Sequence, residues 1–259
     1  MRKAIREQLI KYAEQFETAS FIQGDPSWFM HQVKGRLNQE TMAFIAGSLS
    51  YGSRKQFLPK IQTLLDASQG EPYEWVRSGA YATTFPDNHQ CFYRLYDNHT
   101  MLYFMRSLQK LIATYWSLGE FSFQAVQNGN AMDGDALKVL TALSHYFKEQ
   151  GLTGIVPQPV TSLCKRPCMF LRWMVRDNSP VDLGLWSNHI DKTSLYIPMD
   201  THVMQTARRL GLVSTRTASW ATIRTLTREM AKVFPTDPAR GDFALYGADA
   251  LKENPTFST

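Results

Sequence analysis

Hydrophobic residues recur at helical spacing along most of this 259-residue chain, and this pattern constrains the fold more than any other feature. Between Asp97 and Trp116, for example, apolar side chains return every three or four residues, as they do on one face of a helix. Few stretches alternate between apolar and polar residues with the period of two that is typical of a strand. The pattern therefore predicts a nearly all-α fold without internal repeats.

Local start and stop signals divide this pattern into separate helices. Asn38 is expected to cap an early helix that ends at Tyr51-Gly52-Ser53. Gly151 is expected to close a helix that begins near Asp133, and a loop rich in glycine and proline follows. Further helices are predicted over residues 5–16, 54–67, 97–116, 165–176, 201–210, 219–234 and 238–251, with a short one from Pro72.

Charge and cysteine content exclude several classes of protein. The 28 Lys and Arg residues exceed the 23 Asp and Glu residues, and the net charge of +5 permits a polyanionic partner without requiring one. Three cysteines are too few for a disulfide framework or a four-cysteine iron–sulfur loop, and the histidines lack zinc-site spacing. We therefore expect no metal and no cofactor.

The sequence contains neither a signal peptide nor a long apolar run, so we expect a cytoplasmic protein with no membrane partner.

An aspartate, Asp200, lies directly before a predicted helix and two residues after Pro198. An aspartate in this position commonly caps the helix, by accepting a hydrogen bond from a free backbone N–H group of the first turn. It can also hold a negative charge in a fixed place against a cation that forms during a reaction. Both roles stay open at the level of the sequence.

Three segments, taken together, resemble segments of one known superfamily. Residues 42–54 cover most of the predicted early helix and its end, residues 164–176 begin a helix at Lys165, and residues 198–212 read Pro-Met-Asp-Thr-His-Val, then Arg-Arg-Leu-Gly-Leu. In this order they resemble the helix-hairpin-helix DNA glycosylases, the superfamily of endonuclease III and 8-oxoguanine glycosylase. In that comparison Lys165 matches the lysine that opens the helix after the hairpin, and Asp200 matches the catalytic aspartate.

A narrower resemblance rests on two further patterns. From Lys165 the chain reads Lys-Arg-x-x-Met-Phe-Leu-Arg-Trp-Met-Val-Arg, and from Val181 it reads Val-Asp-Leu-Gly-Leu-Trp. These patterns, with Phe-Ala-Leu-Tyr-Gly from Phe243, are similar to those of a bacterial family of unknown function within the same superfamily. That family is nearest to the archaeal 8-oxoguanine glycosylases, but the match does not supply its activity.

The resemblance implies a two-lobed helical fold with the catalytic residues in the cleft between the lobes. Residues 37–164 would form a central bundle, and residues 1–36 together with 165–259 would form the second lobe. Lys165 would attack the sugar C1′ and form a Schiff base, for which its amine must be neutral. Asp200 would remain ionised, stabilise the oxocarbenium-like sugar and help relay the proton. Without the resemblance, Lys165 would be interpreted as a solvated lysine at a helix start.

The hairpin departs from the pattern of that superfamily. The usual motif is Leu-Pro-Gly-Val-Gly-x-Lys, in which the glycine amides bind a DNA phosphate. Here residues 159–165 read Pro-Val-Thr-Ser-Leu-Cys-Lys, without a glycine. We therefore expect an atypical hairpin, with a phosphate clamp that is altered or absent.

Aromatic and basic residues near these segments complete the candidate site. The aromatic side chains would receive or replace a base that leaves the stack, although core packing is the commoner role for each: Tyr51, Phe170, Trp173 and Trp186. The basic residues would contact DNA phosphates, although a solvated surface explains each as well: Arg54, Lys55, Arg166, Arg172, Arg176, Arg208 and Arg209.

The sequence leaves three hypotheses about function. The first is a DNA glycosylase for a damaged base such as an oxidised purine, with or without AP-lyase activity. The second is a catalytically inactive relative that binds nucleic acid, which the missing hairpin glycines favour. The third is an interaction protein without a nucleic-acid partner, which the modest net charge permits. The oligomeric state and the choice between DNA and RNA are not defined by the sequence.

Overall fold

The structure, a computed structural model of the chain, describes residues 1–253 and is mostly helical. This confirms the predicted all-α fold class. A two-stranded antiparallel sheet, β1 (Cys91–Tyr93) with β2 (Tyr96–Asp97), interrupts the helices, and short 3₁₀ turns include η1 (Ala19–Ile22), η2 (Ala80–Thr83), η3 (Lys192–Ser194) and η4 (Pro238–Arg240). The α-helices are α1 (Lys3–Phe16), α2 (Trp28–His31), α3 (Arg36–Leu49), α4 (Arg54–Ala67), α5 (Pro72–Arg77), α6 (Asn98–Tyr115), α7 (Leu118–Asn128), α8 (Asp135–Glu149), α9 (Lys165–Val175), α10 (Thr201–Arg209), α11 (Trp220–Ala231) and α12 (Gly241–Glu253).

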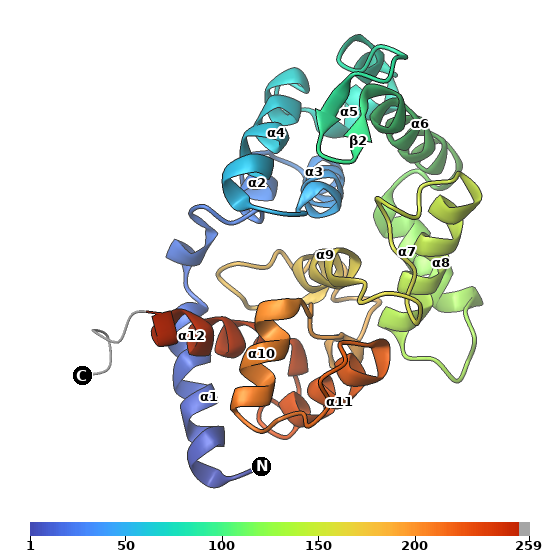
Figure 1. Cartoon of the computed structure of the whole chain (residues 1–259). Coiled ribbons are helices and arrows are strands. Elements are labelled where there is room, and N and C mark those ends of the chain that lie inside the picture. Colours follow the sequence, from blue (N-terminus) through green and yellow to red (C-terminus); the bar gives the residue numbers. More distant parts are fainter. Residues whose placement is uncertain (254–259) are drawn as a thin grey trace.

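Most helices form two groups with α9 between them, and α7 and α8 lie to one side, at the right of the view (Figure 1). The upper group contains α2 to α6 and the small sheet, and the lower group contains α1, α10, α11 and α12. Helix α1 packs along α12, so the first and last helices of the described chain lie side by side, whereas α2 packs against α3 and α4. The division into residues 37–164 and residues 1–36 with 165–259 stays a prediction, because its boundaries are not tested by these contacts.

Helix α9 is the central element of the core. Its side chains are buried on every face from Pro167 to Val175, as expected for a helix that is covered on all sides. The ring of Phe170 lies 5.2 Å from that of Phe44 in α3 and 5.2 Å from that of Trp186. Because the body of α9 is enclosed, its first residue, Lys165, is held in a defined place where the helix reaches the surface.

Most predicted helix bounds agree with the structure, but one cap and several elements do not. Helix α4 has the predicted bounds, whereas Asn38 does not cap the early helix, which starts at Arg36 after Gly35. The side chain of Asn38 instead accepts a hydrogen bond from the backbone N–H of Tyr73, at the start of α5. The sequence also did not predict helix α7 or the small sheet. The sheet gave no signal because strands of two and three residues are too short for a periodic pattern.

The helices of the described chain were also compared with the length and hydropathy that a bilayer requires. Within residues 1–253, none is both long and apolar enough to cross a membrane.

Candidate active site

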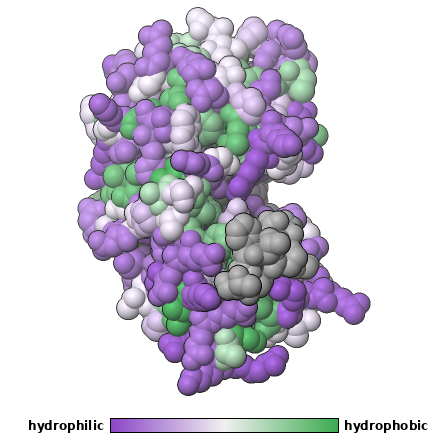
Figure 2. Space-filling model, turned by 90° about the vertical axis from the view of Figure 1, so that its left-hand side faces the viewer, coloured by the Kyte–Doolittle hydropathy of each residue, from purple (hydrophilic) through white to green (hydrophobic). Residues whose placement is uncertain are grey.

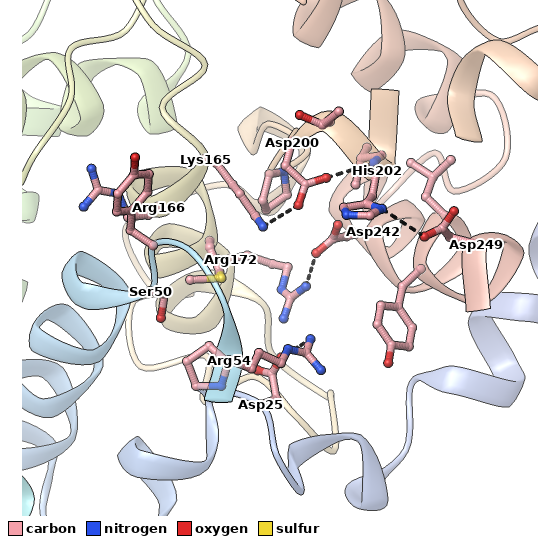
Figure 3. A pocket seen from close by; sticks show the side chains of 18 of the residues that line it. Asp25, Ser50, Arg54, Lys165, Arg166, Arg172, Asp200, His202, Asp242 and Asp249 are labelled. Atoms are coloured by element: carbon pink, nitrogen blue, oxygen red, sulfur yellow. Dashed lines mark hydrogen bonds and ion pairs between the residues drawn. The ribbon is translucent and has the colours of Figure 1, made fainter. Parts of the chain in front are cut away.

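Lys165 and Asp200 form a close ion pair at the start of two different helices. The Nζ atom of Lys165 donates a hydrogen bond of 2.6 Å to Oδ2 of Asp200 (Figure 3). Lys165 opens α9, directly after Cys164 in the left-handed conformation (φ 46°), and Asp200 immediately precedes α10. The two side chains are 39% and 31% exposed, so a ligand in the adjoining cavity can reach both. The structure therefore brings together the two residues that the sequence singled out.

The carboxylate of Asp200 performs both roles that the sequence left open. Its Oδ1 atom accepts a 2.9 Å hydrogen bond from the backbone N–H of Val203 and thereby caps α10, while Oδ2 faces Lys165. Burial raises the pKa of Asp200, but the Lys165 ammonium, its hydrogen bond and the Val203 N–H lower it by more. The net pKa is below the usual value, so this carboxylate is ionised at neutral pH.

A cavity of about 650 Å³ adjoins this ion pair, a size typical of a small-molecule or nucleobase pocket. Its lining comes from both helix groups, and Figure 2 shows a face of the molecule that is hollowed between an upper and a lower part. The Arg54 guanidinium lies 5.9 Å from the ring centre of Tyr246, which links α4 to α12 across the cavity. Aromatic, cationic and anionic side chains therefore meet in one concave site: Phe21, Tyr51, Tyr246, Arg54, Lys165, Arg166, Arg172, Asp25, Asp200, Asp242 and Asp249.

The structure buries Arg172 and Arg176, the two predicted phosphate contacts on α9, and pairs both with carboxylates. Their side chains, on the enclosed helix α9, are only 4% and 2% exposed. Both guanidinium groups donate to Asp182, which is fully buried, and Arg172 also donates to Asp242 on the cavity wall (Figure 3). Arg176 makes further ion pairs with Glu17 at 2.6 Å and Asp237 at 2.8 Å. These arginines neutralise buried carboxylates, since a charge inside a protein requires a partner.

Three of the four predicted aromatic residues do not form a base pocket. Phe170, Trp173 and Trp186 are almost completely buried in the core, and the indole N–H of Trp186 donates to Glu40 at 2.9 Å. They cannot receive a base without unpacking α9, so their role in this fold is core packing. Tyr51 differs, because it is 39% exposed and lines the cavity. Its ring lies 5.0 Å from the Arg94 guanidinium carbon and 5.6 Å from that of Arg166.

The remaining basic candidates lie in different places. Arg54 lines the cavity and pairs with Asp25 at 3.2 Å, and Arg166 lines it while donating to the backbone oxygens of Ser48 and Gly154. Lys55 is exposed but does not line the cavity. Arg208 and Arg209 lie at the opposite end of α10 from Asp200, beside a separate shallow cavity. The structure thus brings Arg54 and Arg166 to the site, but not Lys55, Arg208 or Arg209.

Sequence reasoning missed Asp242, an acidic residue of the cavity wall. It lies in the first turn of α12, where an acidic residue has an ordinary explanation in the helix dipole. Burial raises the pKa of Asp242, and Arg172 and Lys165 offset this only in part. One signal in the sequence could have indicated Asp242. It directly precedes the apolar run Phe243-Ala244-Leu245, and these three residues are completely buried in the core.

His202 lies close to a carboxylate at the edge of the cavity. Its Nδ1 atom lies 3.6 Å from Oδ2 of Asp249 on α12, and the imidazole is largely exposed (Figure 3). Within residues 1–253, no group of three or more His, Cys, Asp and Glu residues has the arrangement of a metal site.

Comparison with known proteins identified one family. A family model described as a protein of unknown function (DUF2400) matches residues 25–251, and this range contains the whole Lys165–Asp200 site and Asp242. Comparisons with curated proteins and with solved structures found no match.

Proposed function

The chain belongs to the DUF2400 family, and we propose that it is a DNA glycosylase of the helix-hairpin-helix type, which removes a damaged base through a Schiff base on Lys165. The observation that carries this proposal is the 2.6 Å contact between the Lys165 amine and the Asp200 carboxylate beside an open cavity of about 650 Å³. An amine nucleophile next to a fixed carboxylate is the arrangement that the reaction requires. The resemblance of the segments around Lys165 and Asp200 to these glycosylases supports the same assignment.

The reaction can be written with the two groups in defined roles. Asp200 accepts a proton from the Lys165 ammonium across their hydrogen bond, which frees the amine for attack. The N–C1′ bond forms while the bond from C1′ to the base breaks, and the base leaves with the electron pair and takes the proton from Asp200. The attached nitrogen then transfers a proton to O4′ as the C1′–O4′ bond breaks, which leaves a protonated Schiff base.

The cavity wall supports a damaged purine as the first substrate to test. A base must leave the stack to reach Lys165, and it then needs aromatic surface and hydrogen-bond partners. Tyr51 and Tyr246 offer partly exposed rings, and the Asp242 carboxyl can pair with an N–H group at the edge of a base. An oxidised purine such as 8-oxoguanine carries N–H donors on both of its rings. A cytoplasmic location is part of this proposal.

Borohydride trapping tests the proposed reaction directly. A duplex with one 8-oxoguanine and a duplex with one apurinic site are incubated with protein and borohydride, which reduces a Schiff base to a stable adduct. We expect an adduct with the wild-type chain and none with Lys165→Gln. Lys110→Gln is the matched control, because Lys110 is an exposed lysine of α6 that does not line the cavity. An adduct that persists in Lys165→Gln contradicts the assignment.

A second candidate function is nucleic-acid binding without chemistry, as in an inactive relative. It is favoured by the loop over residues 159–164, which has no glycine and in which Val160 takes a left-handed conformation (φ 70°). This candidate predicts retarded mobility of DNA or RNA in a gel shift, no trapped adduct, and a binding constant that Asp200→Asn leaves unchanged.

A further inference from the structure

Two histidines flank the small β-hairpin, outside the cavity. His89 lies two residues before β1, and His99 is the second residue of α6, which follows β2 directly. Their ring centres lie 5.1 Å apart, with the ring planes inclined by 42°. The two side chains are 80% and 39% exposed, and neither lines the cavity. The pair therefore forms a separate surface cluster that the proposed reaction does not use.

A carboxylate orients each of these imidazoles through its Nδ1 atom. Nδ1 of His89 lies 2.7 Å from Oδ2 of Asp97, and Nδ1 of His99 lies 2.6 Å from Oδ1 of Asp87. A neutral ring that donates from Nδ1 keeps a free lone pair on Nε2. Within residues 1–253 the hydrogen bonds of both rings go to Nδ1, and neither Nε2 atom has a partner. Proteins commonly hold metal-binding histidines in this way, with a carboxylate behind the ring.

The segment that carries His89 is fixed to the start of α6 by further hydrogen bonds. The backbone N–H of His99 donates to the Asn88 carbonyl oxygen at 2.9 Å. The buried side-chain amide of Asn98 donates to Oδ1 of Asn88 at 3.0 Å. Asp97 caps α6 with its Oδ1 atom while its Oδ2 atom orients His89. The two rings are therefore positioned by one framework before any ligand binds, which is the pre-organisation that a binding site needs.

We propose that His89 and His99 bind one Zn²⁺ ion through their Nε2 atoms, with water in the remaining positions. A Zn–N bond is about 2.0–2.1 Å long, and two imidazoles on a tetrahedral ion then have ring centres about 5 Å apart, as these two rings have. The carboxylates of Asp87 and Asp97 supply negative charge directly behind the rings, which balances the charge of a divalent cation. The pair supplies fewer protein ligands than the usual catalytic or structural zinc site, so exchangeable binding is expected.

The position of the two histidines indicates what the ion would do. His89 enters the hairpin and His99 leaves it, so an ion bound to both joins the two ends of this element. A two-stranded hairpin contributes little stability by itself. Zinc would therefore stabilise the hairpin, and this effect does not depend on the glycosylase proposal.

Titration of the full untagged chain with Zn²⁺ alone tests the site, by calorimetry and by ¹H–¹⁵N spectra of the imidazoles. We expect about one ion per chain and a coordination shift of the Nε2 signals of His89 and His99. His89→Gln should weaken binding at least about tenfold, and Asp87→Asn, which removes only the orienting carboxylate, about tenfold. His145→Gln is the matched control, because His145 is also exposed and lies 3.3 Å from a carboxylate, that of Glu149, but belongs to α8 and not to the pair.

Each outcome supports the zinc site or overturns it. The site is refuted if the wild-type chain binds no Zn²⁺ up to millimolar concentration, or if the shifts spread equally over all six imidazoles of the chain. An equal loss of binding in His89→Gln and His145→Gln also refutes it, because it indicates non-specific binding to surface histidines. The spectra of the wild-type chain identify the ligands without any substitution, so the test does not depend on the folding of a variant. Zn²⁺ should also raise the thermal unfolding temperature of the wild type, and EDTA should reverse this.

Discussion

The Nζ atom of Lys165 and the Oδ2 atom of Asp200 lie 2.6 Å apart, although the two residues are separated by 35 positions in the chain. The second oxygen of the same carboxylate caps α10. Because one side chain both caps a helix and faces the amine, substitutions that preserve one role can be compared with substitutions that remove both.

Asp200→Asn and Asp200→Ala should differ in stability but not in chemistry. Asparagine caps a helix about as well as aspartate, whereas alanine at this position loses about 1 kcal/mol. Neither variant can accept the proton of Lys165, so both should give at most traces of the trapped adduct. Thermal unfolding and borohydride trapping measure the two effects separately. A fully active Asp200→Asn variant would contradict the role of the carboxylate.

The stability that Asp200 contributes should depend on pH in the acidic range. Burial raises the pKa of Asp200, but Lys165 and the Val203 N–H lower it by more, so the pKa in the folded state is below that of the unfolded chain. Such a group stabilises the folded state above the unfolded pKa of about 3.9, and this contribution is lost as the pH falls through the lowered folded pKa. Urea unfolding should therefore show a stability difference between wild type and Asp200→Asn that is constant near neutral pH and shrinks below about pH 4. A difference that grows on acidification contradicts this assignment.

Arg176→Met should be one of the most destabilising substitutions of a charged residue. It leaves the fully buried carboxylate of Asp182 with Arg172 alone, it leaves Glu17 with Arg240 as its ion-pair partner, and it removes the partner of Asp237. Breaking a buried ion pair in this way costs about 3–5 kcal/mol. Arg77→Met is the control, because the pair between Arg77 and Glu74 is about half exposed and an exposed ion pair contributes little to stability. Urea unfolding of both variants measures the difference, and equal midpoints would show that the network does not stabilise the fold.

Gly52→Ala should disturb the edge of the cavity more than another glycine with a similar backbone. A Cβ atom at Gly52 would lie 2.6 Å from Arg94 Nη1, whereas at Gly24, which has φ 72°, it would meet nothing within 4 Å. Both substitutions strain the backbone by about 1 kcal/mol, but only the first also displaces Arg94 from Tyr51. We expect Gly52→Ala to lower duplex binding several-fold and Gly24→Ala to leave it unchanged, as measured by gel shift. Equal binding by the two variants would show that the contact between Arg94 and Tyr51 has no effect on DNA.

The fold class and most helix positions were predictable because their signals are local. The bounds of α4, the start of α9 at Lys165 and the start of α10 after Asp200 all follow from spacing and capping within one turn of the chain. The structure differs from the prediction where a capping side chain forms its hydrogen bond with another segment that packs beside it. Asn38 is a good capping residue, but its amide serves the start of α5 instead of its own helix.

The sequence by itself therefore determined which segments are helical and that Lys165 and Asp200 each open one of them, because these properties depend on neighbouring residues. Only the tertiary structure decided that the amine and the carboxylate meet, and that Arg172 and Arg176 are buried while Arg54 is partly exposed at the cavity. A local pattern cannot distinguish an arginine that faces solvent from one that is paired with a distant carboxylate such as Glu17 or Asp237. The packing of whole helices decides which charged groups pair with each other. Helix α9 can lie at the centre of the core because its nine consecutive residues from Pro167 to Val175 can all be buried.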